Sequence, residues 1–157
     1  MLRDTPALPP PAPAAEILML ADSLTPHCWV DAVADRLGRE PLDGVLPHLI
    51  GRGEGLTPAG DDALCGYMAA WYACDTGVAF GHGQRVLANL GLTGEPSRSL
   101  LRAAATDGAV FAPATAMLRA LLRADTAAAP PALRSPVGAG RSSGRPLLQG
   151  VVSGLRE

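Results

Sequence analysis

Aromatic and charged residues are both scarce in this 157-residue sequence. Phe, Trp and Tyr together make up 4% of the chain and Asp, Glu, Lys and Arg 18%, whereas there are 18 glycines and 15 prolines. A core with so few rings must be built mainly from Ala, Leu and Val, with backbones that approach one another closely. The length suits one compact unit rather than two independent enzymatic domains.

Three further absences exclude classes of protein. The 13 Lys and Arg are scattered and the net charge is −2, so no basic stripe is present and nucleic acid is not expected as a partner. No run approaches the roughly 18 apolar residues of a membrane span, and no secretory leader is recognisable, so we expect no membrane partner and a cytoplasmic protein. Cys28, Cys65 and Cys74 have neither an even count nor CxxC spacing, so we expect reduced, buried and inert thiols.

The chain divides into a proline-rich flexible tail, residues 1–14, and a helical domain, residues 15–157. Residues 6–13 read PALPPPAP, which favours an extended and solvated conformation. Beyond the tail, apolar residues recur at helical spacing, and no segment alternates like a strand. We therefore predict a mainly α fold, a single compact domain of about five or six helices, with glycine-rich loops at helix N-termini.

The expected helices are bounded by prolines and glycines. Residues 61–75 carry few charges on any face, so this helix is expected at the centre of the fold. Ser97 is expected to cap a helix that ends at Gly108. Pro41 to Pro47 and Gly77 to Gly83 are interpreted as connections. The full set of expected helices is residues 26–38, 61–75, 84–90, 98–106, 113–125 and 146–156.

Two glycine- and hydroxyl-rich loops each lead into an expected helix. Residues 60–66 and 144–150 share a seven-residue frame that begins and ends with glycine. Thr57 precedes the first frame, and Ser142 and Ser143 precede the second. Unpaired N–H groups and the helix dipole attract anions to such helix ends, so we predict one pocket shared by both. Glycines before helices are also ordinary turn chemistry, and so short a similarity can arise by chance.

Asp61 and Asp62 need a separate interpretation, because carboxylates repel the anions that a helix end attracts. Either residue could simply cap its helix, which stabilises a helix by about 0.5–2 kcal/mol. Two adjacent carboxylates point in different directions. The second could bind Mg²⁺ beside a phosphate, accept a hydrogen bond from a substrate amino group, or orient a general base. No Gly-Lys-Ser/Thr follows, so the loop is not a Walker P-loop.

The sequence of residues 53–66, GEGLTPAGDDALCG, resembles a motif of the AllH-like family. This family is a domain of unknown function associated with oxamate carbamoyltransferase, an enzyme of purine catabolism and allantoin degradation. The resemblance continues through residues 97–108 and returns in residues 140–150. It therefore covers the C-terminal part of the chain only.

The resemblance implies a subunit of a transferase that moves a carbamoyl group between oxalurate and phosphate. Other transferase subunits would be its partners, and phosphate, carbamoyl phosphate, oxamate or oxalurate its small anionic substrate. Asp61 and Asp62 would be the catalytic residues, and would be the ligands if Mg²⁺ is present; no cofactor is otherwise implied. Arg141 would pair with a carboxylate or phosphate. The residues expected to bind the anion are Gly55, Thr57, Gly60, Arg141, Ser142, Ser143 and Gly144.

The sequence departs from the family pattern in its second loop. Arg141 stands where a histidine is common in the family, and Pro146 where an aspartate is common. Family members also usually carry a longer region before the first motif. Two alternatives therefore stand beside the transferase subunit: a non-catalytic small-anion-binding or regulatory subunit, and a truncated relative without activity.

Overall fold

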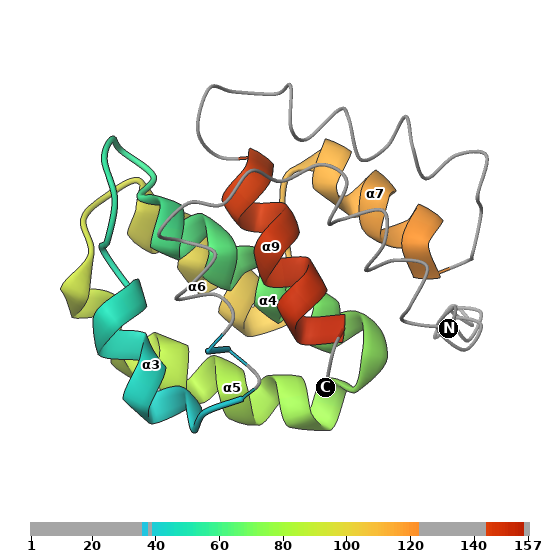
Figure 1. Cartoon of the computed structure of the whole chain (residues 1–157), viewed down its shortest axis with the longest axis horizontal. Coiled ribbons are helices and arrows are strands. Elements are labelled where there is room, and N and C mark those ends of the chain that lie inside the picture. Colours follow the sequence, from blue (N-terminus) through green and yellow to red (C-terminus); the bar gives the residue numbers. More distant parts are fainter. Residues whose placement is uncertain (1–35, 38, 123–143, 156–157) are drawn as a thin grey trace, which may run out of the picture.

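The computed structural model describes residues 36–37, 39–122 and 144–155, and these form a bundle of helices (Figure 1). In this part of the chain there are six α-helices, one 3₁₀ helix and no strand. The prediction of a mainly α, single compact domain of about five or six helices is confirmed. The elements are α3 (Leu42–Leu49), α4 (Ala59–Cys74), α5 (Thr76–Ala88), η1 (Leu90–Leu92), α6 (Ser97–Asp107), α7 (Ala112–Leu122) and α9 (Gly144–Leu155).

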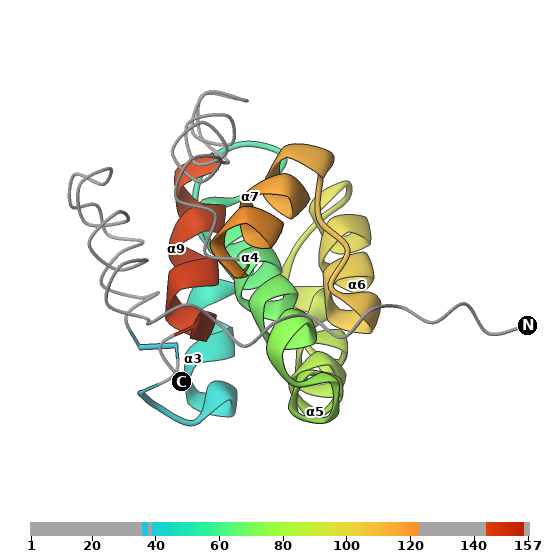
Figure 2. The ribbon, with the colours of Figure 1, turned by 90° about the vertical axis from the view of Figure 1, so that its right-hand side faces the viewer.

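Helix α4 lies at the centre of the bundle, as its low charge predicts. Residues 60–70 are all buried, and Tyr67 and Met68 are among the largest fully buried side chains. The helix packs against α3, α5, α6 and α9 (Figures 1 and 2). None of the helices in the described ranges is long and apolar enough to cross a membrane. The proline-rich tail of residues 1–14 and nearly all of the helix expected at residues 26–38 lie outside the described residues.

Two glycines bring α4 and α9 into backbone contact. A Cβ atom added at Gly66 would overlap the carbonyl oxygen of Leu147 on α9. A Cβ atom added at Gly150 would overlap the carbonyl oxygen of Ala63 on α4. Ala63 precedes Gly66 by the same interval as Leu147 precedes Gly150, so the contact is reciprocal. Only glycine permits helices to approach this closely at both positions.

The two helices run in the same general direction. Gly150 lies against Ala63 and Tyr67 of α4, and Gly154, about one turn further along α9, lies against Tyr67 and Ala70, with an added Cβ 2.8 Å from the Ala70 Cβ. Figure 2 shows both helices running from the top of the view to the bottom. The N-termini of α4 and α9 therefore lie at the same end of the bundle.

Helix α5 begins earlier than predicted, so the interpretation of Gly77 to Gly83 as a connection is wrong. Asp75 is the N-cap residue, and its side chain accepts hydrogen bonds from the N–H groups of Gly77 at 2.9 Å and Val78 at 3.1 Å. This cap satisfies N–H groups at the start of a helix. Gly83 is buried in α5, and the position requires glycine because a Cβ there would overlap the Ala105 carbonyl oxygen of α6.

Helix α3 occupies the other segment that we expected to be a connection. Pro41 precedes its first residue and Pro47 lies inside it. A proline inside a helix removes one backbone hydrogen bond. Burial of one apolar face offsets this cost, with side chains at helical spacing. The buried residues of that face are Leu42, Val45, Leu46 and Leu49.

Helix α6 ends as predicted but begins differently. The N-cap position is held by Pro96, so Ser97 is the first helical residue rather than the cap, and its buried hydroxyl bonds elsewhere. Gly108 ends the helix with a left-handed φ of 72° and donates its N–H to the Ala104 carbonyl at 2.8 Å. A side chain there would also collide with the ring of Tyr72. The predicted glycine stop is confirmed.

The reciprocal contact predicts opposite effects for two glycine-to-alanine substitutions. Gly150→Ala should lower the free energy of unfolding by about 1–3 kcal/mol, because the new methyl overpacks the junction with α4. Gly81→Ala is the control, since a Cβ there meets nothing within 4 Å inside α5. That control should stabilise the protein by about 0.5–1 kcal/mol through lower chain entropy. Urea unfolding of both variants measures the difference, and an unchanged stability in Gly150→Ala would contradict the close contact.

Candidate functional site

A cavity of about 180 Å³ lies where the N-terminal turns of α4 and α9 meet the segment after α6. This is the volume of roughly six water molecules, which suits a small ligand. Two of the predicted site residues, Thr57 and Asp62, lie together in its wall. The lining residues are Thr57, Asp62, Cys65, Leu100, Ala109, Val110, Phe111 and Leu147.

The loop before α4 is shaped by glycines at alternate positions. The φ angles of Gly51, Gly53 and Gly55 are 75°, 122° and 88°, in the region that favours glycine. A Cβ at Gly51 would overlap the Leu92 carbonyl oxygen, and one at Gly53 would lie 2.7 Å from the Ala59 nitrogen. Gly55 is exposed, with open space around it. The loop therefore folds back onto the start of α4, with Gly55 on its outer side.

Most N–H groups at the start of α4 are already bonded to the protein. Gly60 is buried and donates its N–H to the Arg52 carbonyl at 2.9 Å. The N–H groups of Asp61 and Asp62 both donate to the Pro58 carbonyl, at 2.9 and 3.1 Å. These bonds close the loop onto the helix. The anion-binding role predicted for Gly60 stays a prediction, and its N–H serves the loop in this structure.

Asp61 joins three separate segments to α4. Its side chain is 1% exposed, and one oxygen, Oδ1, accepts the Gly51 N–H at 2.8 Å. The other oxygen, Oδ2, accepts the hydroxyls of Thr93 at 2.5 Å and Ser97 at 2.6 Å. These distances are typical of strong bonds to a charged acceptor. Asp61 therefore fixes the loop before α4, the turn before α6 and the start of α6, and the catalytic role predicted for it stays a prediction.

Asp62 faces a different part of the molecule. Successive residues of an α-helix point about 100° apart, so neighbouring carboxylates serve different surroundings. Asp62 is 7% exposed and lines the cavity together with Thr57 of the loop and Leu147 of α9. Of the two predicted carboxylates, Asp62 is the one that a ligand in this cavity would meet.

Cys65 lies in the cavity wall as a protonated thiol. Burial raises the pKa of the Cys65 thiol well above its usual value, and the charges of Asp62 and Asp61 raise this pKa further. The thiolate is the nucleophilic form of cysteine, so a protonated Cys65 does not act as a nucleophile at neutral pH. Cys65 is free and buried as predicted, whereas Cys74 is exposed, so the prediction of burial is wrong for Cys74 because it lies at the last turn of α4. Cys28 lies outside the described residues.

The N-terminus of α9 is electrostatically different from that of α4. The first turn of α4 contains Asp61 and Asp62, whereas the first turn of α9 contains no acidic residue. The first N–H groups of a helix have no carbonyl partner within it, and the dipole makes that end positive. Gly144 is the first residue of α9. Arg141, Ser142 and Ser143, the other predicted residues of the second loop, lie outside the described residues.

The described residues contain no ready-made metal site. Within residues 36–37, 39–122 and 144–155, no group of three or more His, Cys, Asp and Glu side chains could hold a metal ion. Magnesium prefers six oxygen ligands and keeps several waters. A magnesium ion on Asp62 would therefore need most of its ligands from substrate phosphate and water.

The sequence did not indicate the remaining walls of the site. Leu100 of α6 and Val110 and Phe111 after it form an apolar wall of the cavity. Thr93 and Ser97 are the hydroxyl partners of Asp61. Residues 97–108 belong to the motif that resembles the AllH-like family, which is the one signal that linked this segment to the loop before α4. Nothing in the local pattern marked the other wall residues.

One of three comparisons with known proteins gives a match. A family model described as oxamate carbamoyltransferase subunit AllH matches residues 49–155. No curated protein and no solved structure matches the chain. The matched range contains the loop before α4, the cavity and the whole of α9.

The hydrogen bonds of Asp61 predict a large loss of stability when its side chain is removed. Asp61→Ala should lower the free energy of unfolding by about 3 kcal/mol or more, because three donors lose their acceptor in the interior. Asp43→Ala is the matched control, since the Asp43 side chain is 70% exposed and should change stability little. Urea unfolding of the two variants provides the measurement, and equal stabilities would show that Asp61 does not hold these segments together.

Proposed function

The chain belongs to the family of oxamate carbamoyltransferase subunit AllH, and from this premise we propose that it is a subunit of an oxamate carbamoyltransferase-like complex. In this proposal the cavity between α4, α6 and α9 binds the small substrate during carbamoyl transfer between oxalurate and phosphate. The observation that carries the proposal is the meeting of Asp62, Thr57 and the start of α9 at one cavity.

Oxamate has a carboxylate at one end and an amide at the other, and we assign each end to a different group at the cavity. The amide N–H groups would donate to Asp62, because a carboxylate accepts such bonds strongly. The oxamate carboxylate, or a phosphate, would bind at the N-terminus of α9, which carries no acidic residue in its first turn. Ser142, Ser143 and Arg141 immediately precede that turn in the sequence and would complete the anion site.

The chemistry needs a group that exchanges a proton with the amide nitrogen. In the direction from oxalurate, a phosphate oxygen attacks the ureido carbonyl carbon and forms a C–O bond. The C–N bond breaks, and the departing oxamate nitrogen takes up a proton. In the reverse direction this nitrogen loses the proton as it attacks carbamoyl phosphate. Asp62 is the residue that we assign to this proton exchange, since it would hydrogen-bond the same nitrogen.

The apolar wall supports a reaction that must avoid water. Carbamoyl phosphate is an activated acyl donor, and water in the site would compete with the acceptor nitrogen. Leu100, Val110 and Phe111 cover one side of the cavity and Leu147 another. With the mouth of the cavity covered, such a wall would exclude water and strengthen the hydrogen bonds within the site.

Exposed apolar side chains beside the cavity support action in a complex. Large apolar side chains near the cavity are exposed, with Leu56 at 75%, Leu100 at 49% and Phe111 at 38%. Exposed apolar side chains of this size are typical of surfaces that another protein covers. We propose that a partner transferase subunit covers the mouth of the cavity.

The proposed role of Asp62 is tested by carbamoyl transfer in the assembled complex. The full chain, oxamate, carbamoyl phosphate and the partner subunits would be mixed and oxalurate production followed. Asp62→Asn should lower the rate at least about 100-fold, because the amide keeps the shape but loses the proton acceptor. Thr57→Ala should weaken oxamate binding. Asp43→Asn, on the exposed face of α3, is the control that keeps full activity.

Normal turnover by the Asp62→Asn complex would refute the assignment of Asp62. Oxamate or phosphate binding without turnover, in every combination of subunits, would favour the non-catalytic anion-binding subunit instead.

A further inference from the structure

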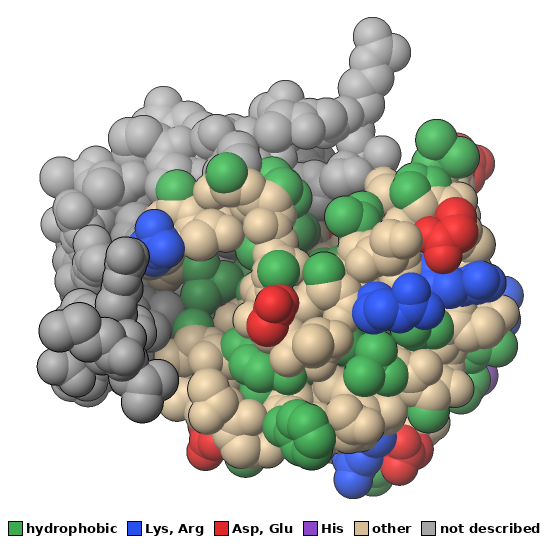
Figure 3. Space-filling view, turned by 180° about the vertical axis from the view of Figure 1, so that it is seen from behind, with side chains coloured by type: hydrophobic (Ala, Val, Ile, Leu, Met, Phe, Trp, Pro, Cys, Tyr) green, Lys and Arg blue, Asp and Glu red, His purple; other side chains and the backbone are tan. Residues whose placement is uncertain are grey.

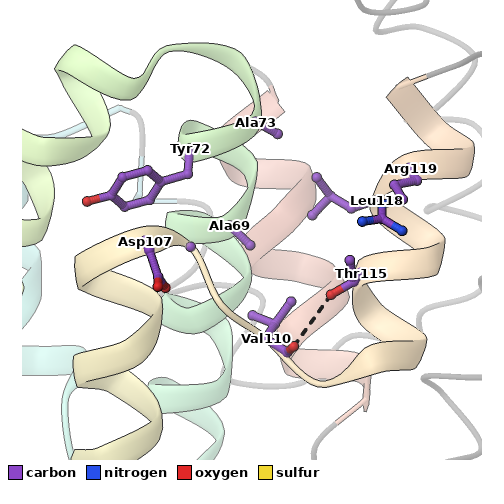
Figure 4. Close-up of a pocket in the computed structure, with 9 residues that line it drawn as sticks. Ala69, Tyr72, Ala73, Asp107, Val110, Thr115, Leu118 and Arg119 are labelled. Carbon is purple, nitrogen blue, oxygen red and sulfur yellow. Dashed lines mark hydrogen bonds between the residues drawn. The ribbon is translucent and has the colours of Figure 1, made fainter. Parts of the chain in front are cut away.

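A second cavity, of about 210 Å³, lies between α4, α6 and α7 (Figure 4). It shares only Val110 with the lining of the candidate site. Its floor is apolar and carries small side chains, which leaves room for a ligand of several non-hydrogen atoms. The lining residues are Ala69, Tyr72, Ala73, Asp107, Gly108, Val110, Thr115, Leu118 and Arg119.

Two side chains of opposite charge lie on different walls of this cavity and form no ion pair with each other. Asp107 is the last residue of α6, and Arg119 lies in the last turn of α7. Figure 4 shows them on opposite sides of the space between these helices. Among the described residues, the ion pairs closer than 4.0 Å are Arg36–Glu40 and Arg85–Asp43, so Asp107 and Arg119 do not neutralise each other.

The polar groups around these two charges are largely committed to the protein. The Tyr72 hydroxyl donates to the Ala105 carbonyl at 2.9 Å, and Figure 4 shows it pointing away from Arg119. The Thr115 hydroxyl lies 3.4 Å from the Val110 carbonyl. Asp107 accepts the Ala109 N–H at 3.1 Å through Oδ1, which holds its carboxylate in place. The guanidinium of Arg119 and the carboxylate of Asp107 are therefore the groups that a ligand would address.

We propose that this cavity is a second ligand site, for a small zwitterion of the amino-acid type. The ligand carboxylate would pair with Arg119, whose planar guanidinium binds carboxylates through two parallel hydrogen bonds. The ligand ammonium group would pair with Asp107. Its methylene groups would lie on the floor formed by Ala69, Ala73 and Leu118.

The charge arrangement favours a zwitterion over ligands of one charge. Arg119 would attract a phosphate, but Asp107 would repel it. Asp107 would attract a simple cation, but Arg119 would repel it. A molecule with both charges satisfies both walls. The volume of about 210 Å³ offers room for a compact amino acid. Figure 3 shows, beside the grey atoms, a hollow with hydrophobic side chains inside and a basic and an acidic side chain at its edges.

Titration of the full chain with glycine, β-alanine and 4-aminobutyrate, followed by amide NMR, tests the proposal. These probes differ only in the separation of their two charges. At least one should shift the amides of Gly108, Val110 and Thr115 in a saturable way. Acetate and ethylammonium, which carry one charge each, should bind at least about tenfold more weakly, because each loses one charge-assisted pair.

Variants of the two charged residues identify the site. Arg119→Gln and Asp107→Asn should each weaken binding of the best probe about tenfold or more. Arg102→Gln, an exposed position on α6 away from the cavity lining, should bind as the unchanged chain does. Asp62→Asn should also bind normally, which separates this site from the candidate site. Circular dichroism checks that each variant is folded.

Three results would overturn the proposal. The first is the absence of any saturable shift at these amides with all three amino acids. The second is equal binding of acetate and the amino acids, which would leave only an anion site. The third is unchanged binding in both Arg119→Gln and Asp107→Asn. None of these results bears on carbamoyl transfer, whose outcome depends on Asp62.

Discussion

The close contact between α4 and α9 is the constraint on which the rest of this structure depends. Gly66 and Gly150 each face a carbonyl oxygen of the opposite helix, so the two backbones touch at a point where any larger residue would separate them. Because the helices run in the same direction, this contact also brings their N-termini to one end of the bundle. Two glycine-containing segments far apart in the sequence thereby come to border one cavity with Asp62 in its wall.

The two neighbouring aspartates at the start of α4 face different surroundings. Asp61 accepts three hydrogen bonds, which hold the loop before α4 and the start of α6 in place. These bonds anchor the loop that carries Thr57 and the helix that carries Leu100, and both residues line the cavity. Asp62 lies in the wall of the cavity, and the hydrogen bonds of Asp61 hold the segments around that cavity in place. In our account Asp61 positions the site and Asp62 addresses the substrate.

The parts of the fold that depend on local chemistry could be predicted from the sequence, and the parts that depend on tertiary contact could not. The low charge of α4 placed it at the centre, and Gly108 marked the end of α6. Helix α5 was predicted to begin too late, because its glycines outweighed the cap of Asp75 in the pattern. The frame shared by residues 60–66 and 144–150 predicts two loops that bind a ligand. In the structure, the final glycines of this frame form the close contact between α4 and α9. The partners of Asp61, Thr93 and Ser97, meet it only in the folded chain.

The central claim is that the starts of α4 and α9 form one site for a small anion. Amide NMR of the full chain titrated with oxamate tests it most directly. The account predicts that the amides around Thr57 and Asp62 and those of Arg145, Leu147 and Leu148 shift together, with a single dissociation constant. Shifts confined to one of the two helix starts, or two unrelated dissociation constants, would contradict the shared site.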